Sequence, residues 1–129
     1  MEKVRPFEIF TKRYDKWFDD NPNAYFSEVN LIRNIIPNGL GIEVGVGTGR
    51  FSKPLDIDIG VDPSIKMGKI AKKRGIKLMI GMGEVLPFRT EYFDFLICVK
   101  IVRFCTTLYG VYVFEYRFIF LFFRVLTTH

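Results

Sequence analysis

The feature that most constrains the fold of this chain is a run of alternating glycines, Gly45-Val-Gly47-Thr-Gly49, directly after a short apolar segment. Glycines at such a place let the backbone turn tightly and let a ligand lie against bare peptide. A tight turn without a ligand is the plain alternative, but three glycines at alternate positions exceed what such a turn needs. We therefore expect a ligand-binding loop at the end of a strand.

The segments around the glycine run predict strands and helices in alternation. A helix is expected over residues 63–74, with Pro63 in its first turn and Gly75 just beyond its end, and a shorter helix is expected around residues 50–54. Strand–helix–strand alternation at this spacing gives right-handed units and a parallel sheet, so the expected fold class is α/β. Four short apolar runs predict the strands, at residues 41–46, 57–61, 76–80 and 93–99.

The N-terminal part predicts two helices ahead of the first strand. Asn21-Pro22-Asn23 ends the first of them, and the second is expected from Ala24 to Ile36. We interpret residues 7–36 as a helical cap on a core formed by residues 40–100, within a single domain that spans 1–129. The first helix is indicated by aromatic residues at spacings of three and four, namely Phe7, Phe10, Tyr14, Trp17 and Phe18.

The spacing of the glycines separates two kinds of nucleotide ligand. A dinucleotide-binding loop follows the pattern G-x-G-x-x-G, which brings a helix N-terminus to a pyrophosphate, and its third glycine falls here on Arg50. S-adenosylmethionine has no phosphate, so its loop passes beneath a neutral ribose. Glu43 is placed to bind the ammonium group of such a ligand, usually through a water molecule.

Two further signals follow the second and third expected strands. Asp62, at the tip of the second strand, would accept both hydroxyls of a ribose, as acids do at the carboxyl edge of open parallel sheets. Alone, an Asp before Pro63 and Ser64 is more often a helix N-cap, and its pairing with the glycine run favours the ribose interpretation. In the loop after the third strand, the backbone amides near Gly83 and Glu84 are expected to face an adenine ring.

Four motifs in this order, E-x-G-x-G-x-G, G-V-D-P-S, G-x-x-E-x-L-P-F and F-D, resemble the class I S-adenosylmethionine-dependent methyltransferases. The resemblance is to the small-molecule type, similar to the ubiquinone-biosynthesis methyltransferases, and implies a Rossmann-like fold whose N-terminal cap closes an aromatic over the cofactor. One position departs from the pattern, because an aspartate that commonly meets the adenine amino group falls at Met82. The resemblance implies these cofactor contacts: Tyr14, Glu43, Gly45, Gly47, Gly49, Asp62, Pro63, Gly83 and Glu84.

The activity implied by the resemblance is methyl transfer from S-adenosylmethionine to a small-molecule acceptor. Such transfer relies on proximity and alignment, and the sequence offers no clear base for a hydroxyl or carbon-acid acceptor, so the catalytic residues stay unknown. Enzymes that methylate exocyclic amines have an Asn-Pro-Pro-Tyr type of sequence after the fourth strand, and this chain has Val99-Lys100-Ile101 there. This difference disfavours a DNA or RNA base as the methyl acceptor. The alternative function is a non-catalytic S-adenosylmethionine-binding fragment or pseudoenzyme that lacks the acceptor site.

Composition limits the partners and the compartment. The net charge is +5, and the lysine-rich stretch over residues 66–77 is interpreted as a solvated helix face in preference to a nucleic-acid patch. Cys98 and Cys105 lack CxxC spacing, and the single histidine is His129, so neither a metal site nor a disulfide scaffold is expected. The N-terminus lacks the apolar core of a signal peptide, and we expect a cytoplasmic protein.

Residues 101–129 depart from what the resemblance implies, which is an amphipathic helix, a glycine turn and three further strands. They instead carry aromatic residues that alternate as in a strand. No membrane helix is expected, because charged residues at 115, 117 and 124 interrupt the span. Three interpretations remain: a hairpin on the fourth strand, a contact between copies in a homo-oligomer, or out-of-frame translation after about residue 100, which we favour and which would leave the C-terminal half of the fold missing.

Overall fold

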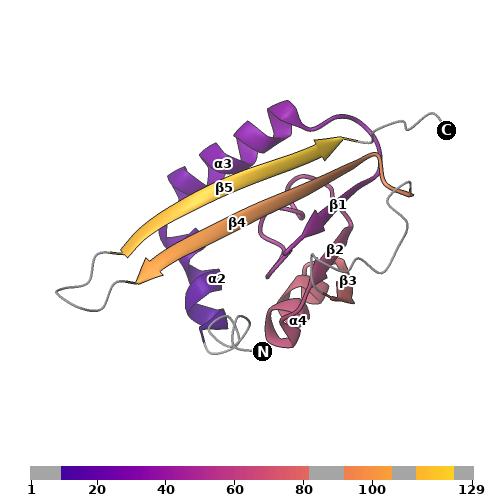
Figure 1. Ribbon diagram of the computed structural model, residues 1–129. Coiled ribbons are helices and arrows are strands. Elements are labelled where there is room, and N and C mark those ends of the chain that lie inside the picture. Colours follow the sequence, from indigo (N-terminus) through magenta and orange to yellow (C-terminus); the bar gives the residue numbers. More distant parts are fainter. Residues whose placement is uncertain (1–9, 82–91, 106–112, 124–129) are drawn as a thin grey trace.

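A computed structural model of the chain describes residues 10–81, 92–105 and 113–123, which form a five-stranded sheet with helices beside it (Figure 1). The strand order is β3-β2-β1-β4-β5, so β1 lies at the centre. The elements along the chain are α2 (Thr11–Asp20), α3 (Pro22–Ile35), β1 (Gly41–Val44), β2 (Ile59–Asp62), α4 (Ile65–Lys73), β3 (Lys77–Ile80), β4 (Phe95–Cys105) and β5 (Val113–Phe123).

The four strands predicted from the apolar runs are parallel to one another. β1 pairs with β2 on one side and with β4 on the other, so that Glu43 is in register with Gly60 and Ile97. From β1 the chain builds outward through β2 and β3 and then returns to add β4 on the other side of β1. Open parallel sheets bind ligands at the carboxyl ends of the strands where the order reverses in this way. This confirms the α/β, Rossmann-like class of fold and points to the end of β1.

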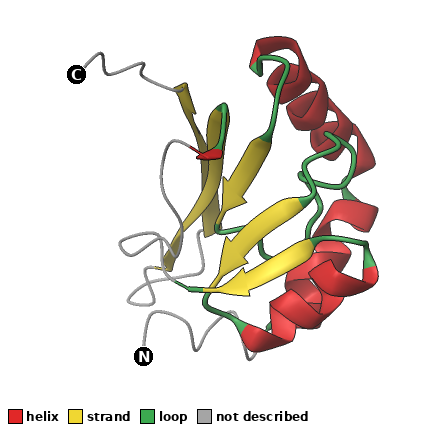
Figure 2. Cartoon of the chain, turned by 90° about the vertical axis from the view of Figure 1, so that its right-hand side faces the viewer, coloured by secondary structure: helices red, strands yellow, loops and turns green. Residues whose placement is uncertain are grey.

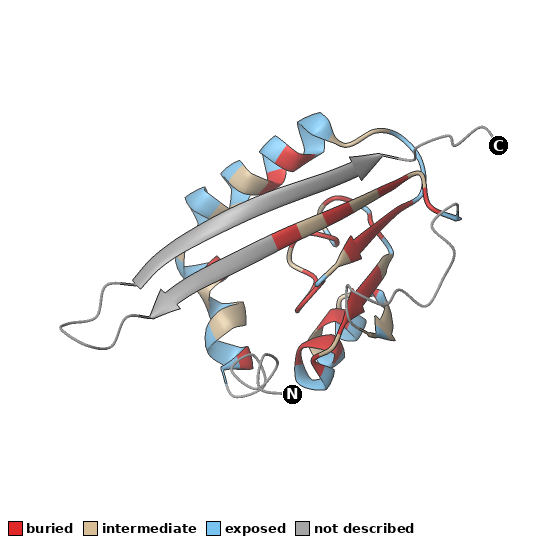
Figure 3. Ribbon diagram, in the orientation of Figure 1, coloured by how far each residue is buried: buried red, intermediate tan, exposed pale blue. Residues whose placement is uncertain are grey.

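The described helices all lie on the same side of the sheet (Figure 2). α2 and α3 contribute Phe18, Val29 and Ile32 to a cluster that also holds Ile97 of β4, and each of these side chains is almost fully buried. α4 packs separately, with Ala71 against β3. The buried positions gather on β1, β2 and the adjoining part of β4 (Figure 3). Burial of these apolar side chains holds the helices to the strands.

Several boundaries differ from those predicted, and capping explains two of them. α4 begins at Ile65, because Ser64 is its N-cap and accepts a hydrogen bond from the Met67 amide at 3.3 Å. Pro63 therefore precedes the helix, and its predicted place in the first turn is wrong. The predicted break at residues 21–23 is confirmed, because α2 ends at Asp20, but α3 begins at Pro22 instead of Ala24, since a proline in the first turn loses no hydrogen bond. The short helix expected around residues 50–54 is a series of turns.

The aromatic tail forms the hairpin that was one of its three interpretations. β5 runs antiparallel to β4 in continuous register, from Phe95 opposite Phe123 to Cys105 opposite Val113. β4 is therefore longer than the strand predicted over residues 93–99, and β5 takes the edge of the sheet where the resemblance implies a helix and further strands. The frame-shift origin of the segment and its role between copies stay predictions. None of the helices in the described ranges is long and apolar enough to cross a membrane.

Shortening the chain tests the pairing of β4 with β5. A chain that ends at Cys105 should be less soluble than the full chain, because it exposes the unpaired edge of β4. A chain that ends at Phe123 is the matched control and should behave like the full chain. Soluble yield and light scattering measure the difference. An out-of-frame tail that does not pack predicts the opposite, namely unchanged or improved solubility on removal of β5.

Candidate cofactor site at the end of the central strand

The glycine loop after β1 contains three left-handed glycines, with φ of 74° at Gly45, 57° at Gly47 and 83° at Gly49. Their surroundings differ. A Cβ on Gly49 would lie 3.1 Å from the Ile76 side chain and 3.6 Å from Ala71, so this glycine allows close packing on α4. A Cβ on Gly47 would lie 3.6 Å from the Tyr14 hydroxyl, in ordinary contact. Gly49 is thus needed by the fold itself.

Gly45 is the glycine that no packing contact explains. A Cβ there would meet no atom of the described residues within 4 Å, and the residue is exposed whereas Gly47 and Gly49 are buried. Its backbone N–H donates to the Val61 carbonyl at 2.8 Å, which holds the start of the loop against β2. The loop therefore exposes a piece of backbone that carries no side chain and is fixed by a hydrogen bond to β2. It does so at the point where the strand order reverses.

Asp62 fastens the loop to the end of β2. Its Oδ2 accepts a hydrogen bond from the Gly47 amide at 2.8 Å, and its Oδ1 accepts one from the Ser64 amide at 2.8 Å. Asp62 is buried, with only 7% of its surface exposed. Because Ser64 caps α4, the alternative in which Asp62 is the N-cap is wrong. A carboxylate accepts about four hydrogen bonds, so these two amide contacts are compatible with further donors.

Glu43 lies buried in the central strand, with 1% of its surface exposed. Burial raises the pKa of its carboxyl to about 8; the hydrogen bond donated by the Ser52 hydroxyl opposes this rise, and the nearby charge of Asp62 adds to it. That hydrogen bond is 2.6 Å long. At neutral pH the folded chain therefore holds a proton on Glu43, which keeps an uncompensated charge out of the sheet.

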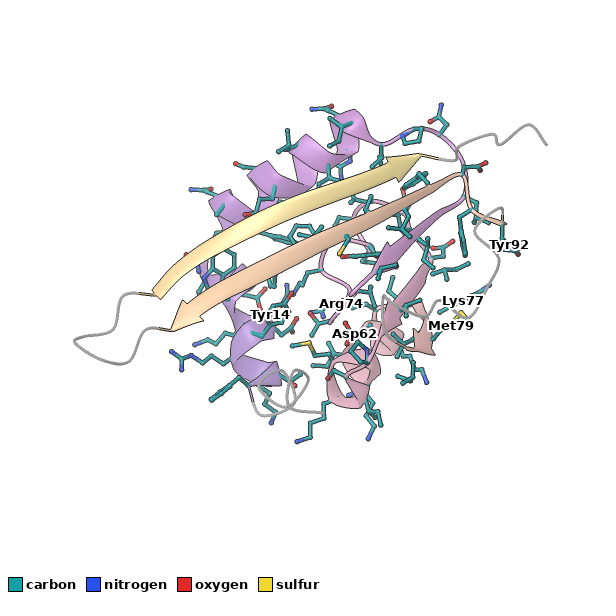
Figure 4. All side chains as sticks on the ribbon, in the orientation of Figure 1. Tyr14, Asp62, Arg74, Lys77, Met79 and Tyr92 are labelled. Atoms are coloured by element: carbon teal, nitrogen blue, oxygen red, sulfur yellow. The ribbon has the colours of Figure 1, made fainter. Side chains whose placement is uncertain are left out.

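Tyr14 reaches the glycine loop from α2, as the cap interpretation requires. Its hydroxyl lies beside Gly47, and its ring meets that of Phe18 edge-on with centroids 5.4 Å apart. Figure 4 shows Tyr14, Asp62 and Arg74 gathered between α2 and α4. The structure thus brings side chains from α2, from the end of β2 and from the end of α4 together beside the glycine loop.

An ion-pair cluster joins α2 to the loop, and the sequence did not reveal it. Asp15 accepts from Arg50 Nε at 2.9 Å and from Arg74 Nη1 at 3.0 Å, while Arg50 also pairs with Asp19 at 2.9 Å. Arg74 donates as well to the Thr48 carbonyl at 2.7 Å. Burial alone would raise the pKa of Asp15, but its hydrogen bonds with the two arginines outweigh that effect and lower it to about 2. The only hint of this cluster in the sequence was Arg50, which stands where a dinucleotide-binding loop has its third glycine.

The remaining predicted contacts are placed only in part. Pro63 lies between Asp62 and Ser64 in the connection to α4, while Gly83 and Glu84 fall outside the described residues. Within the ranges that the structure describes, no group of three or more His, Cys, Asp or Glu side chains could hold a metal ion.

The sheet order, the glycine loop and the acid that anchors it define a Rossmann-like domain with a candidate ligand site at the end of the central strand. Comparison with known proteins then gives the family. A sequence family described as a methyltransferase domain matches residues 42–113, more than half of the chain. The chain belongs to this family, which confirms the resemblance to the class I S-adenosylmethionine-dependent methyltransferases.

Two relatives show how far the sequence similarity extends. An uncharacterized protein of Methanocaldococcus jannaschii is 52% identical over 98 residues, which are 76% of this chain and 48% of that protein. An uncharacterized protein of Mycobacterium tuberculosis is 34% identical over 87 residues, 62% of this chain and 30% of that one. The chain thus spans about half the length, or less, of these relatives.

A solved structure gives the same fold. The crystal structure of a Thermotoga maritima protein, described as an S-adenosylmethionine-dependent methyltransferase and possible histamine N-methyltransferase, superposes with a TM-score of 0.71 at 35% identity. The match covers 75% of this chain and 61% of that one.

The buried carboxyl of Glu43 predicts a specific pH dependence of stability. Its folded pKa of about 8 lies above its ordinary value of 4.5, so the folded state keeps a proton that the unfolded state releases between these values. The free energy of unfolding should fall as pH rises through that window, by up to about 1.4 kcal/mol per pH unit. Asp15, with its lowered pKa, adds no slope there. Glu43→Gln keeps the shape of the side chain and removes the titration.

Urea unfolding of both chains at several pH values between 5.5 and 7.5 measures this effect. The stability of Glu43→Gln relative to the parent chain should rise steadily across the series. Parallel pH profiles for the two chains would show that Glu43 is ionised in the folded state.

Proposed function

We propose that this chain binds S-adenosylmethionine over the glycine loop and passes its methyl group to a small-molecule acceptor. The observation that carries the proposal is Gly45, an exposed glycine whose missing side chain leaves open space beside a loop that Asp62 holds rigid. Membership of the methyltransferase-domain family supports the same ligand.

The residues around the loop suit the parts of this ligand. Asp62 would accept the ribose hydroxyls, and Tyr14 would lie over the ligand from α2. Ile65 and Ile80 are exposed apolar side chains close to Asp62, because Ile65 opens α4 and Ile80 is in register with Asp62 on β3. They would cover the faces of an adenine, and sequence reasoning did not single out either isoleucine as a cofactor contact. The loop amides near Gly83 and Glu84, expected to face the ring, stay a prediction.

The amino-acid end of the ligand would face the end of β1, where Glu43 lies. An ammonium group nearby favours the ionised carboxylate, so binding would lower the pKa of Glu43 from its raised value. Pro63 would contribute through the backbone that it fixes between Asp62 and α4. The division of the chain into a cap over residues 7–36, a core over 40–100 and a tail stays part of this proposal.

The ligand, when bound, supplies a sulfonium methyl whose bond to sulfur breaks as the acceptor bonds to carbon, with the electron pair passing to sulfur. The chain would contribute orientation and exclusion of water, which are the main sources of rate for such a transfer. An acceptor amine loses its proton in the same reaction. Small amines, histamine among them, are reasonable acceptors to assay first, because the Thermotoga protein is described as a possible histamine N-methyltransferase.

A second candidate is favoured by the hairpin. β5 pairs directly with β4, where the resemblance implies a helix and further strands that would build the acceptor site. With β5 in this place, the domain would bind the cofactor without turning it over. Acceptor-dependent formation of S-adenosylhomocysteine distinguishes the two, because only the enzyme produces it.

Calorimetric titration tests the ligand itself. The chain should bind S-adenosylhomocysteine and should bind NAD more weakly, because Arg50 stands where a pyrophosphate loop needs its third glycine. Arg50 is moreover engaged with Asp15 and Asp19, which keeps its guanidinium from serving as a phosphate ligand. Tighter binding of NAD than of S-adenosylhomocysteine would refute the assignment.

A pair of variants separates ligand binding by Asp62 from its structural contacts. Asp62→Ala should weaken S-adenosylhomocysteine binding by about 1–3 kcal/mol, the scale of losing charge-assisted hydrogen bonds. Ser64→Ala is the matched control, since it removes the cap of α4 and should cost about 1 kcal/mol of stability with little loss of affinity. Affinity by calorimetry and stability by urea unfolding are measured on the same preparations. Equal affinities for the two variants would contradict a ribose contact at Asp62.

A further inference from the structure

Asp15 is the only carboxylate in the described residues that both Arg50 and Arg74 contact. Arg50 reaches it through Nε at 2.9 Å and Nη2 at 3.2 Å, and Arg74 through Nη1 and Nη2, each at 3.0 Å. Each guanidinium group therefore donates hydrogen bonds to both carboxylate oxygens of Asp15. Paired N–H···O bonds of this kind fix orientation as well as adding energy.

The two arginines come from different parts of the structure. α2 also meets the loop through the pair between Asp19 and Arg50 at 2.9 Å, whereas Asp15 is its contact with Arg74 among the described residues. Arg50 closes the glycine loop, and its carbonyl accepts a hydrogen bond from the Tyr25 hydroxyl of α3. Arg74 is the C-cap residue of α4 and also binds the carbonyl of Thr48 within the loop. Asp15 thus connects the cap helix to the loop and to the helix that packs against it.

Tyr14 depends on this connection because it precedes Asp15 on α2. α2 is ten residues long and has no side-chain cap, a length at which an isolated helix is marginal. Phe18 anchors one side of it in the core, while the Asp15 contacts determine how the end that carries Tyr14 meets Gly47.

We propose that Asp15 is a positioning residue, which holds Tyr14 over the glycine loop through Arg50 and Arg74 and thereby sets the affinity for the cofactor without touching it. The inference rests on the proposed function, because it needs a ligand under Tyr14. A chain whose cap is docked for only part of the time binds with an affinity reduced by that fraction.

The test uses Asp15→Asn with Asp20→Asn as its control. Asp20 lies on the same helix, is largely exposed, and pairs only with Lys16 at 3.8 Å among the described contacts. Trp17 is the only tryptophan in the chain and lies in α2, packed beside the core, so its emission reports docking of this helix. Both variants and the parent chain are titrated with S-adenosylhomocysteine by calorimetry, and their tryptophan emission is recorded before and after saturation.

The expected result is about a tenfold loss of affinity in Asp15→Asn, counted per folded molecule, and none in Asp20→Asn. Ligand-free Asp15→Asn should show red-shifted tryptophan emission that returns toward the parent spectrum on saturation. In a Tyr14→Ala background, Asp15→Asn should cost little further affinity, because the side chain that it positions is gone. If Asp15→Asn does not fold, Arg74→Gln replaces it, since that variant keeps the pair between Asp15 and Arg50.

Two outcomes overturn the inference, and they differ from failure of the proposed function. Parent-like affinity in Asp15→Asn despite lower stability would show a role confined to the fold, and so would losses in Asp15→Asn and Tyr14→Ala that simply multiply. Failure of the parent chain to bind S-adenosylhomocysteine would instead refute the proposed function itself, whatever the tryptophan emission of Asp15→Asn shows about docking.

Discussion

The carboxylate of Asp15 is where three separate segments of the chain meet. α2, the glycine loop and the end of α4 each place a charged side chain or a carbonyl in the same cluster. The side chains of Asp15 and Arg50 are 18% and 14% exposed, so this pair is less screened than one at the surface. The interaction of Asp15 with Arg50 and Arg74 also lowers the pKa of its carboxyl. Without it, α2 would keep its packing through Phe18 and the more exposed pair between Asp19 and Arg50, but it would lose its contacts with Arg74 at the end of α4.

The loop itself combines rigidity with an open surface. Asp62 and the Val61 carbonyl take up its amides, Gly49 packs closely against α4, and Gly45 is left exposed. The three glycines thus have different structural roles, although the sequence pattern does not distinguish them. Preorganised backbone lowers the cost of binding, because less conformational freedom is lost when the ligand arrives.

The sequence predicted the features that depend on local pattern. Apolar runs and alternating elements predicted the parallel sheet, which the structure confirms. The glycine spacing with Asp62 predicted a cofactor site at the end of the central strand, and this stays a prediction. Local pattern failed at the segment over residues 50–54, which forms turns. It also failed at Pro63, because Ser64 caps the helix one residue later.

The ion-pair cluster was beyond reach for a different reason. Asp15 lies 35 positions from Arg50 and 59 from Arg74, so only the folded chain brings them together. The tail shows the same limit. Its alternating aromatics indicated a strand and allowed a hairpin on the fourth strand, but the sequence did not favour that pairing, which the structure shows.

The central claim is that the cofactor lies on the exposed glycine loop, and amide chemical shifts during a titration test it most directly. S-adenosylhomocysteine added to the isotope-labelled chain should shift the amide signals of Gly45, Gly47 and Ser64 most strongly. Those of α3, such as Asn30 and Arg33, should stay in place. The largest shifts along α3, or an unmoved signal from Gly45 at saturation, would contradict the account.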